Sequence, residues 1–167
     1  MATLKELRDE RLRKLEELKQ LGVNPYPATA HRTHMAADVA AKYDEYADQT
    51  ICLAGRITSI RKFGKIAFIV LADTSGEAQL FIKNDSIEPL DTANSQLGLA
   101  QLNLLDSGDF IEATGQVIKT QTGEPSVEVK TLRLLTKSLR PMPTKQDGFT
   151  NKEERLRRRY IDTNVNK

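Results

Sequence analysis

Cysteine is nearly absent from the 167-residue sequence, in which Cys52 stands alone. A single thiol excludes an intrachain disulfide framework and a cysteine-based zinc finger, and it is compatible with a reducing cytosol. Long apolar runs are also missing, since the longest, Ile66 to Ala72, has seven residues, whereas a transmembrane helix needs about 20. No apolar segment follows the charged N-terminus as it would in a signal peptide. The sequence therefore predicts a cytoplasmic protein without a membrane partner.

Glycine-rich phosphate-binding motifs are absent too. No two of the nine glycines have the spacing of G-x-G-x-x-G, and Gly64-Lys65 lacks the upstream glycine of a P-loop. His31 and His34 form an H-x-x-H pair without a cysteine or carboxylate in an adjacent metal-binding pattern, which favours exposed loop histidines. Cys52 lies in a predicted strand with no histidine beside it and is expected to be a buried, inert thiol. We therefore predict no catalytic residues, metal or cofactor in this chain.

The composition that remains is that of an ordinary globular protein. Apolar residues make up 39%, charged residues 29%, and the formal net charge is +2. A chain of this length can bury roughly 68–70% of its unfolded surface, so one compact domain with some additional chain is expected. The small net charge does not decide whether the partner is a nucleic acid, and the distribution of charge along the chain has to be considered.

The first segment has a helical pattern. Its leucines recur on one half of a helical wheel from Leu4 to Leu21. Thr3 and Glu6 have the spacing of a capping box, and Gly22 can end the helix in the left-handed conformation. The prolines that follow forbid more helix, and the chain is then poorly periodic up to the first strand. Residues 1–49 are expected to form an N-terminal helical extension.

From Thr50 onward the period of the apolar residues changes to two. Five strands are predicted at 51–62, 66–72, 78–83, 110–119 and 126–135. Between the third and fourth lies a segment whose apolar residues, Leu97, Leu104 and Leu105, suggest a helix. Five strands with a helical insert between the third and fourth are typical of a mainly β fold, the five-stranded Greek-key OB-fold barrel. This barrel is predicted over residues 50–137.

The last part of the chain, 138–167, is expected to be a linker and a basic segment. Arg140-Pro141-Met142-Pro143 is typical of a stiff, extended connection, and Thr150 with Glu153 predicts the start of a short C-terminal helix over Asn151 to Tyr160. Four arginines cluster in that helix: Arg155, Arg157, Arg158 and Arg159.

Charge is segregated along the barrel sequence. The segment 84–112 contains six acidic residues and no lysine or arginine. The first three strands and the turns between them instead carry two acidic residues, Asp73 and Glu77, and five basic ones: Arg56, Arg61, Lys62, Lys65 and Lys83. This pattern places positive potential on the face and loops with which OB folds bind single strands.

Phenylalanines in these strands could supply a stacking surface. An exposed aromatic side chain on such a face contributes about 1–3 kcal/mol per stacked base. Phe68, Phe81 and Phe110 are the candidates, although most strand phenylalanines belong to the core. The pattern alone leaves both interpretations open for each ring.

Several short motifs follow one another in a characteristic order. The leucine helix precedes Asn24-Pro25-Tyr26-Pro27, and the strands contain Ala54-Gly55-Arg56-Ile57, Gly64-Lys65 with Phe68, Gln79-Leu80-Phe81, Thr122-Gly123-Glu124 and Leu132 to Lys137. The segment from Glu153 to Asp162 extends the series. In this order the motifs resemble the anticodon-binding domain of class II lysyl-tRNA synthetases, and the resemblance covers nearly the whole chain.

The resemblance implies a binding site for the anticodon loop of a lysine tRNA. Phe68 would stack on the central uridine, and Gln79 would form hydrogen bonds with the edge of that base. Glu124 would accept a hydrogen bond from a base N–H, and Arg61 would contact the base or a phosphate.

Three further cations, Arg56, Lys62 and Lys65, are expected to contact phosphates on the basis of charge alone.

The resemblance also implies that the chain is the N-terminal part of a lysine–tRNA ligase. The first class II motif, the ATP-binding arginines and the glycine-rich third motif would follow Lys167, so ATP and Mg²⁺ are assigned to a catalytic domain outside this chain. The fragment alone is expected to be inactive, and its parent to be a cytoplasmic homodimer in which the arginine cluster is structural.

Two alternatives remain at this point. The same face would serve a stand-alone OB module that binds single-stranded nucleic acid without strong sequence preference. The leucine helix and the acidic insert would instead suit a module for protein assembly.

Overall fold

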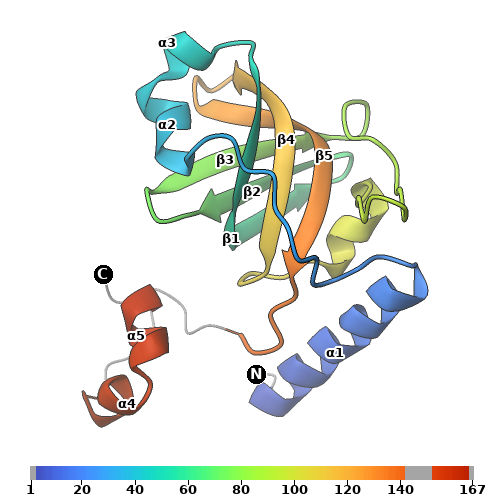
Figure 1. The fold of residues 1–167 in the computed structure, drawn as a ribbon, viewed down its shortest axis with the longest axis vertical. Coiled ribbons are helices and arrows are strands. Elements are labelled where there is room, and N and C mark those ends of the chain that lie inside the picture. The colour runs from blue at the N-terminus through green and yellow to red at the C-terminus, as the bar shows by residue number, and fades with distance from the viewer. Residues whose placement is uncertain (1–2, 142–151, 166–167) are drawn as a thin grey trace.

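The computed structural model describes residues 3–141 and 152–165. Five strands form the body of the structure, with helices at its ends (Figure 1). The strands are β1 (Thr50–Phe63), β2 (Ile66–Ala72), β3 (Glu77–Lys83), β4 (Phe110–Lys119) and β5 (Pro125–Thr136). The helices are α1 (Leu4–Gln20), α2 (Ala36–Ala41), α3 (Tyr43–Tyr46), the 3₁₀ helix η1 (Leu99–Leu104), α4 (Lys152–Arg157) and α5 (Arg159–Val165).

The five strands close into a barrel in the order β1-β2-β3-β5-β4. Neighbouring strands are antiparallel except for β3 and β5, which run parallel. The long strand β1 closes the ring, because its first half pairs with β4 and its second half with β2. The register of β1 against β2 shifts between Ile57 and Ser59, which allows the strand to bend. All five predicted strands are confirmed, with ends that differ by no more than one residue.

The interior of the barrel is filled by the alternate side chains of each strand. In β3, Ala78, Leu80 and Ile82 are buried, while Gln79, Phe81 and Lys83 point to the outer face, as the alternation predicts. The largest side chains with no exposed surface include Leu53, Ile57, Ile69, Leu71, Leu80, Ile111, Leu132 and Leu134. Burial of each such side chain stabilises the fold by about 1.5–3 kcal/mol.

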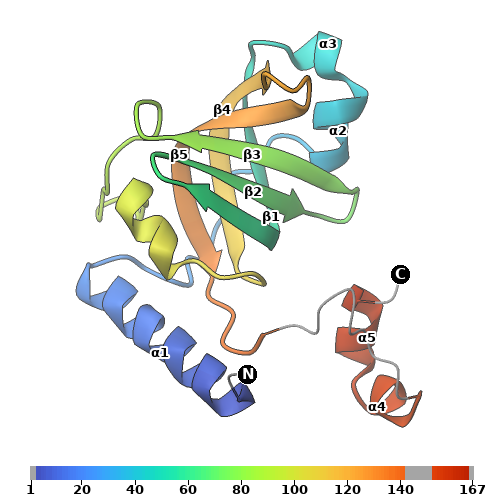
Figure 2. The same ribbon diagram turned by 180° about the vertical axis from the view of Figure 1, so that it is seen from behind.

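Helix α1 has the predicted ends but uses only part of its leucine face. The Thr3 hydroxyl accepts from the Glu6 amide at 3.2 Å, the Glu6 carboxylate accepts from the Thr3 amide at 2.6 Å, and Gly22 has a φ of 80°. Leu15 and Leu18 are buried, whereas Leu4 is 59% exposed. The first turns of α1 extend past the end of the barrel (Figures 1 and 2), so the leucines there find no neighbouring core.

A buried cluster of charges joins α1, the segment after η1 and the end of β5. The Lys137 ammonium lies 2.7 Å from Asp109 and 2.5 Å from Asp106, and neither Lys137 nor Asp109 has exposed side-chain surface. Lys14 of α1 adds a second cation, 2.6 Å from Asp106. Burial raises the pKa of Asp106, but hydrogen bonds from Lys137 and Lys14 outweigh burial and hold this pKa below its ordinary value.

The segment between α1 and β1 is more ordered than its sequence suggests. Residues 36–46 contain the short helices α2 and α3, and α2 packs on β1, β3 and β5. No local side chain caps α2. Its first amide, of Ala36, instead donates to the Asp73 carboxylate in the β2–β3 turn at 2.8 Å, and the next, of Ala37, donates to the Ser75 hydroxyl at 3.0 Å. The helix start is therefore set by a contact that is distant in sequence.

The insert between β3 and β4 contains one 3₁₀ helix, η1, where the leucine pattern suggested a helix of undefined limits. Leu97, Leu102, Leu104 and Leu105 are buried. Part of the insert lies alongside β5, since the Leu97 amide donates to the Leu132 carbonyl at 2.7 Å. The leucines therefore anchor the insert on the barrel.

The basic C-terminal segment forms two short helices, α4 and α5, in place of the single predicted helix. Arg155 and Arg159 both bind the Asp162 carboxylate, at 2.7 and 3.0 Å. The predicted cap Thr150 and the linker residues Met142 and Pro143 lie outside the described residues. Of the helices within 3–141 and 152–165, none has both the length and the apolar character needed to cross a membrane.

Candidate nucleic-acid interface

Outward-facing side chains of four strands form a row across the barrel. Arg61 of β1 pairs with Phe68 of β2, Phe68 pairs with Phe81 of β3, and Phe81 pairs with Glu128 of β5. Directly paired residues point to the same side of a sheet, so these four side chains are neighbours. Figure 2 shows β1, β2 and β3 on the near side of the barrel, with α2 and α3 at the upper right and α1 below.

Gln79 stands in the next row, diagonal to Phe68. It pairs with Val70 of β2 and with Ser126 of β5, which puts it about 7–8 Å from Phe68. The Gln79 Nε2 donates to the Ser126 Oγ at 3.0 Å, and this hydroxyl donates in turn to the Glu124 carbonyl at 3.2 Å. Within the described residues, no donor binds the Gln79 Oε1.

Three phenylalanine rings form an aromatic cluster on this face. Phe68 stacks on Phe81, with ring centres 4.9 Å apart and an angle of 21° between the planes. Phe63 meets Phe68 edge to face, with centres 6.3 Å apart and an angle of 70°. Phe68 and Phe81 are partly exposed and Phe63 is 58% exposed. None of the three rings belongs to the barrel core.

Glu124 lies in the exposed turn between β4 and β5. The turn is closed by the Thr120 amide, which donates to the Glu124 carbonyl at 3.1 Å, and by the Glu124 amide, which donates to the Thr120 hydroxyl at 3.2 Å. Gly123, with a φ of 84°, supplies the left-handed conformation that the turn requires. Because Ser126 pairs with Gln79, Glu124, two residues earlier, lies at the edge of the same face.

The predicted cations are spread unequally around the cluster. Arg61 is in the row of Phe68, and Lys65 is exposed in the β1–β2 turn. Arg56 pairs with Ala72, four residues along β2 from Phe68, which is a distance of about 13 Å. Its guanidinium lies 5.0 Å from the centre of the Phe110 ring. Arg56 and Phe110 therefore belong to a distal part of the outer surface.

Lys62 points to the other side of β1 and is not part of this face. Its ammonium donates to the Leu102 carbonyl at 2.7 Å and to the Asn103 side chain at 2.9 Å. Burial is the main cause of the lowered pKa of Lys62. The alternation of β1 turns Lys62 toward η1, so the expected phosphate contact of Lys62 would lie outside this face and stays a prediction.

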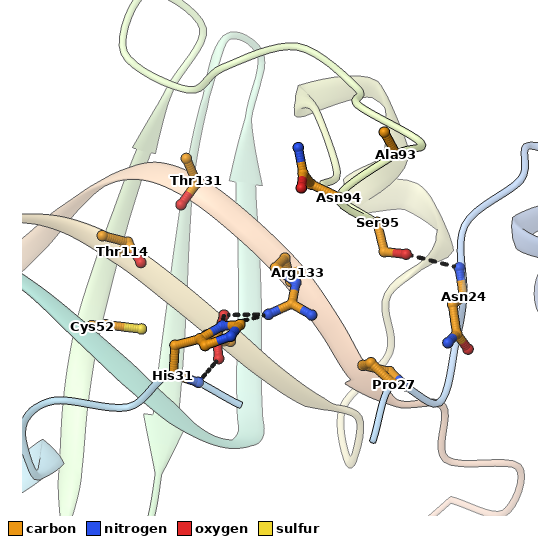
Figure 3. Close-up of a pocket in the computed structure, with 11 residues that line it drawn as sticks. Asn24, Pro27, His31, Cys52, Ala93, Asn94, Ser95, Thr114, Thr131 and Arg133 are labelled. Atoms are coloured by element: carbon orange, nitrogen blue, oxygen red, sulfur yellow. Dashed lines mark hydrogen bonds and ion pairs between the residues drawn. The ribbon is translucent and has the colours of Figure 1, made fainter. Parts of the chain in front are cut away.

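A separate hollow of about 490 Å³ lies over β1, β4 and β5 (Figure 3). The Arg133 guanidinium lies 2.7 Å from the Glu112 carboxylate and 2.9 Å from the His31 Nδ1, and the His31 amide also donates to Glu112. Burial raises the pKa of Glu112, but the hydrogen bonds from His31 and Arg133 outweigh it, and the net pKa is lowered. These charges are matched within the chain, and they fasten the segment around His31 to the barrel.

Cys52 also lines this hollow, and its thiol is buried as expected, with a pKa raised by burial. The part of the chain that the structure describes contains no cluster of three or more His, Cys, Asp or Glu side chains that could hold a metal.

The structure thus brings Phe68, Gln79 and Arg61 together, with Glu124 and Lys65 at the edges of the same face. Phe63 was not predicted as a member of the face, because the predicted first strand ends at Lys62 and Phe63 falls in the predicted turn. The spacing of two between Arg61 and Phe63 was the available signal.

Known proteins resemble this chain along nearly its whole length. The tRNA anticodon family model, described as an OB-fold nucleic acid binding domain, matches residues 51–135. A lysine–tRNA ligase of Carboxydothermus hydrogenoformans is 39% identical over 166 residues, which are 98% of this chain and 32% of that protein. Lysine–tRNA ligases of Moorella thermoacetica and Fervidobacterium nodosum are 40% and 36% identical over 93% and 98% of this chain.

The chain spans about a third of the length of these relatives. The family match covers all five strands of the barrel apart from single residues at its two ends. Fold, strand order and family model agree, and the chain belongs to the family of OB-fold nucleic acid binding domains.

Proposed function

We propose that the outer face of β1, β2 and β3 binds the anticodon loop of a lysine-accepting tRNA, and that the chain serves as the anticodon-binding part of a lysine–tRNA ligase. The observation that carries this proposal is the arrangement of Phe68, Gln79 and Arg61 as neighbouring side chains on the outside of the barrel. Anticodon bases are unpaired, so they can be read individually by stacking and by hydrogen bonds to their edges.

Phe68 is suited to stack on a base. The ring points out of the barrel, and its contact with Phe81 at 4.9 Å holds it in place. A ring that is already ordered loses little conformational freedom when a base stacks on it.

Gln79 is suited to recognise uridine because its amide is oriented by β5. The Ser126 hydroxyl donates its hydrogen to the Glu124 carbonyl, so toward Gln79 it can act only as an acceptor. The Gln79 amide therefore turns its NH₂ group toward Ser126. This leaves the Oε1 acceptor and the second N–H of Nε2 for a ligand. Uridine offers a matching N3–H donor and carbonyl acceptors, whereas cytidine has an acceptor at N3 that would face the Oε1.

The charges around the face fit a loop of nucleic acid. Arg61 and Lys65 would contact phosphates or a base edge, and Arg56 would reach more distant phosphates. Glu124 would accept a hydrogen bond from a base N–H and repel a misplaced phosphate. In the whole ligase, ATP and Mg²⁺ would be bound outside this chain, and the homodimeric assembly and cytoplasmic location inferred from the resemblance belong to this proposal as well.

The proposal predicts a preference for uridine at the centre of the anticodon. We expect the chain to bind a lysine anticodon stem-loop about 5- to 150-fold more tightly than the same stem-loop with cytidine at the central position, because an unpaired buried acceptor costs about 1–3 kcal/mol. Fluorescence anisotropy with the two labelled RNAs measures the ratio. A stem-loop changed only in the stem is the control and should bind like the unchanged RNA.

Equal affinities for the two central bases would contradict the proposal. That result would instead favour a module that binds single strands without base preference. Self-association without measurable RNA binding would favour the role in protein assembly.

A further inference from the structure

Phe63 is an exposed aromatic side chain at the end of the proposed RNA face. The ring is 58% exposed, although a phenylalanine side chain has a large apolar surface that favours burial. It pairs with Ile66 of β2, and its edge-to-face contact with Phe68 at 6.3 Å places it on the same outer surface. The aromatic cluster therefore continues past Phe68 toward the β1–β2 turn.

The surroundings of Phe63 are positively charged. The sequence from Thr50 to Ala72 contains no aspartate or glutamate. Arg61 lies two residues before Phe63 on the same face, and Lys65 follows it in the turn. A ring flanked by cations suits a nucleotide, whose base can stack while its phosphate is neutralised.

The chain leaves space for a ligand at this turn. Gly64 has a φ of 60°, and a Cβ placed on it would meet no atom within 4 Å. Within the described residues, Phe63 makes its ring contact with Phe68 and no cation-π contact. The turn is therefore open around Gly64.

We infer that Phe63 is a second stacking platform, which holds an unpaired base next to the one that Phe68 binds. This inference rests on the proposed function and adds a second nucleotide subsite to it. Successive bases of a single strand stack on neighbouring aromatic side chains in other proteins that bind such strands. The 6.3 Å between the rings suits two nucleotides that follow one another. The Lys65 ammonium would neutralise the phosphate near the second base.

The test compares three variants on the lysine anticodon stem-loop. Phe63→Ala removes the ring, Phe63→Leu keeps apolar surface without an aromatic face, and Phe63→Tyr keeps the face. We expect Phe63→Ala and Phe63→Leu to weaken binding about 5-fold and Phe63→Tyr to bind like the unchanged protein. Because the side chain is largely exposed, the melting temperature of all three should stay within about 2 °C of the original.

RNAs with one abasic nucleotide beside the central uridine identify the base. On one of the two flanking abasic RNAs, Phe63→Ala should bind as tightly as the unchanged protein, since the base that stacks on Phe63 is already absent. Phe68→Ala should still weaken binding to that RNA. Unchanged binding by Phe63→Ala, or an equal loss on both abasic RNAs, would overturn the inference.

The two proposals can fail separately. If the unchanged protein prefers a central uridine while Phe63→Ala has no effect, only the second subsite is wrong. If the unchanged protein shows no preference at the central position, the proposed function itself is wrong.

Discussion

Replacement of Lys137 by methionine should lower the free energy of unfolding by about 3–5 kcal/mol. The Lys137 ammonium is the cation that faces the buried Asp109, 2.7 Å away, and it also donates to the Leu104 carbonyl at 2.9 Å. Methionine fills a similar volume, but it leaves the Asp109 carboxyl in the protein interior without the cation that offsets its burial. Urea denaturation of the two proteins measures the difference.

A matched control and a second variant separate charge from packing. Lys130→Met changes a lysine whose side chain is 68% exposed and lies 4.0 Å from Glu88, and it should alter stability by less than about 0.5 kcal/mol. Adding Asp109→Asn to Lys137→Met removes the unpaired carboxyl group and keeps an acceptor for one of the two amides, of Ser138 and Asp106, that donate to the two Asp109 oxygens. The double variant should therefore recover part of the lost stability. Equal effects of Lys137→Met and Lys130→Met would contradict this account of the cluster.

Replacement of Phe68 by alanine should weaken binding of the lysine anticodon stem-loop by about 5- to 150-fold, which corresponds to about 1–3 kcal/mol. Alanine removes the platform for the central base and leaves the cations in place. Since Phe68 lies on the outer face and not in the core, the variant should lose about 1 kcal/mol of stability, from the aromatic contact with Phe81. A fully buried phenylalanine would cost about 3–5 kcal/mol.

Phe110→Ala is the matched control for the binding measurement. Phe110 is also a partly exposed phenylalanine, at 36%, but it lies beside Arg56 in the distal part of the outer surface. Its removal should leave the affinity for the stem-loop within a factor of about two. A large loss of stability with unchanged RNA binding in Phe68→Ala would show that Phe68 has a structural role only.

The strands of the barrel could be predicted because their signal is local. The alternation from Ala78 to Lys83 assigned each side chain of β3 to the correct face. The capping box at Thr3 and Glu6 similarly fixed the start of α1. These features depend on residues that are close together in sequence.

Features that depend on distant contacts could not be predicted. The start of α2 is capped by Asp73, and the residues near Ala36 in the sequence do not indicate that contact. The buried pair of Lys137 and Asp109 likewise joins residues that are 28 positions apart. The number of buried leucines on α1 was overestimated. Periodicity does not show whether the barrel extends far enough to cover Leu4 and Leu7, which are exposed.

The site was only partly accessible from the sequence. The resemblance supplied Phe68 and Gln79, and the strand pairing places them as neighbours. The sequence did not separate Arg61 from Lys62, which point to opposite sides of β1. Nor did it show that Ser126 orients the Gln79 amide, because β3 and β5 pair across the whole insert.

The position of the RNA on the barrel can be measured directly by NMR titration. In a ¹⁵N-labelled chain, added lysine anticodon stem-loop should shift the backbone amide signals of Arg61, Phe68, Gln79 and Glu124. The amides of His31, Glu112 and Arg133, which surround the hollow over β1, β4 and β5, should keep their positions. Shifts confined to the hollow, with the signals of Phe68 and Gln79 unchanged, would contradict the assignment of the RNA to the β1–β2–β3 face.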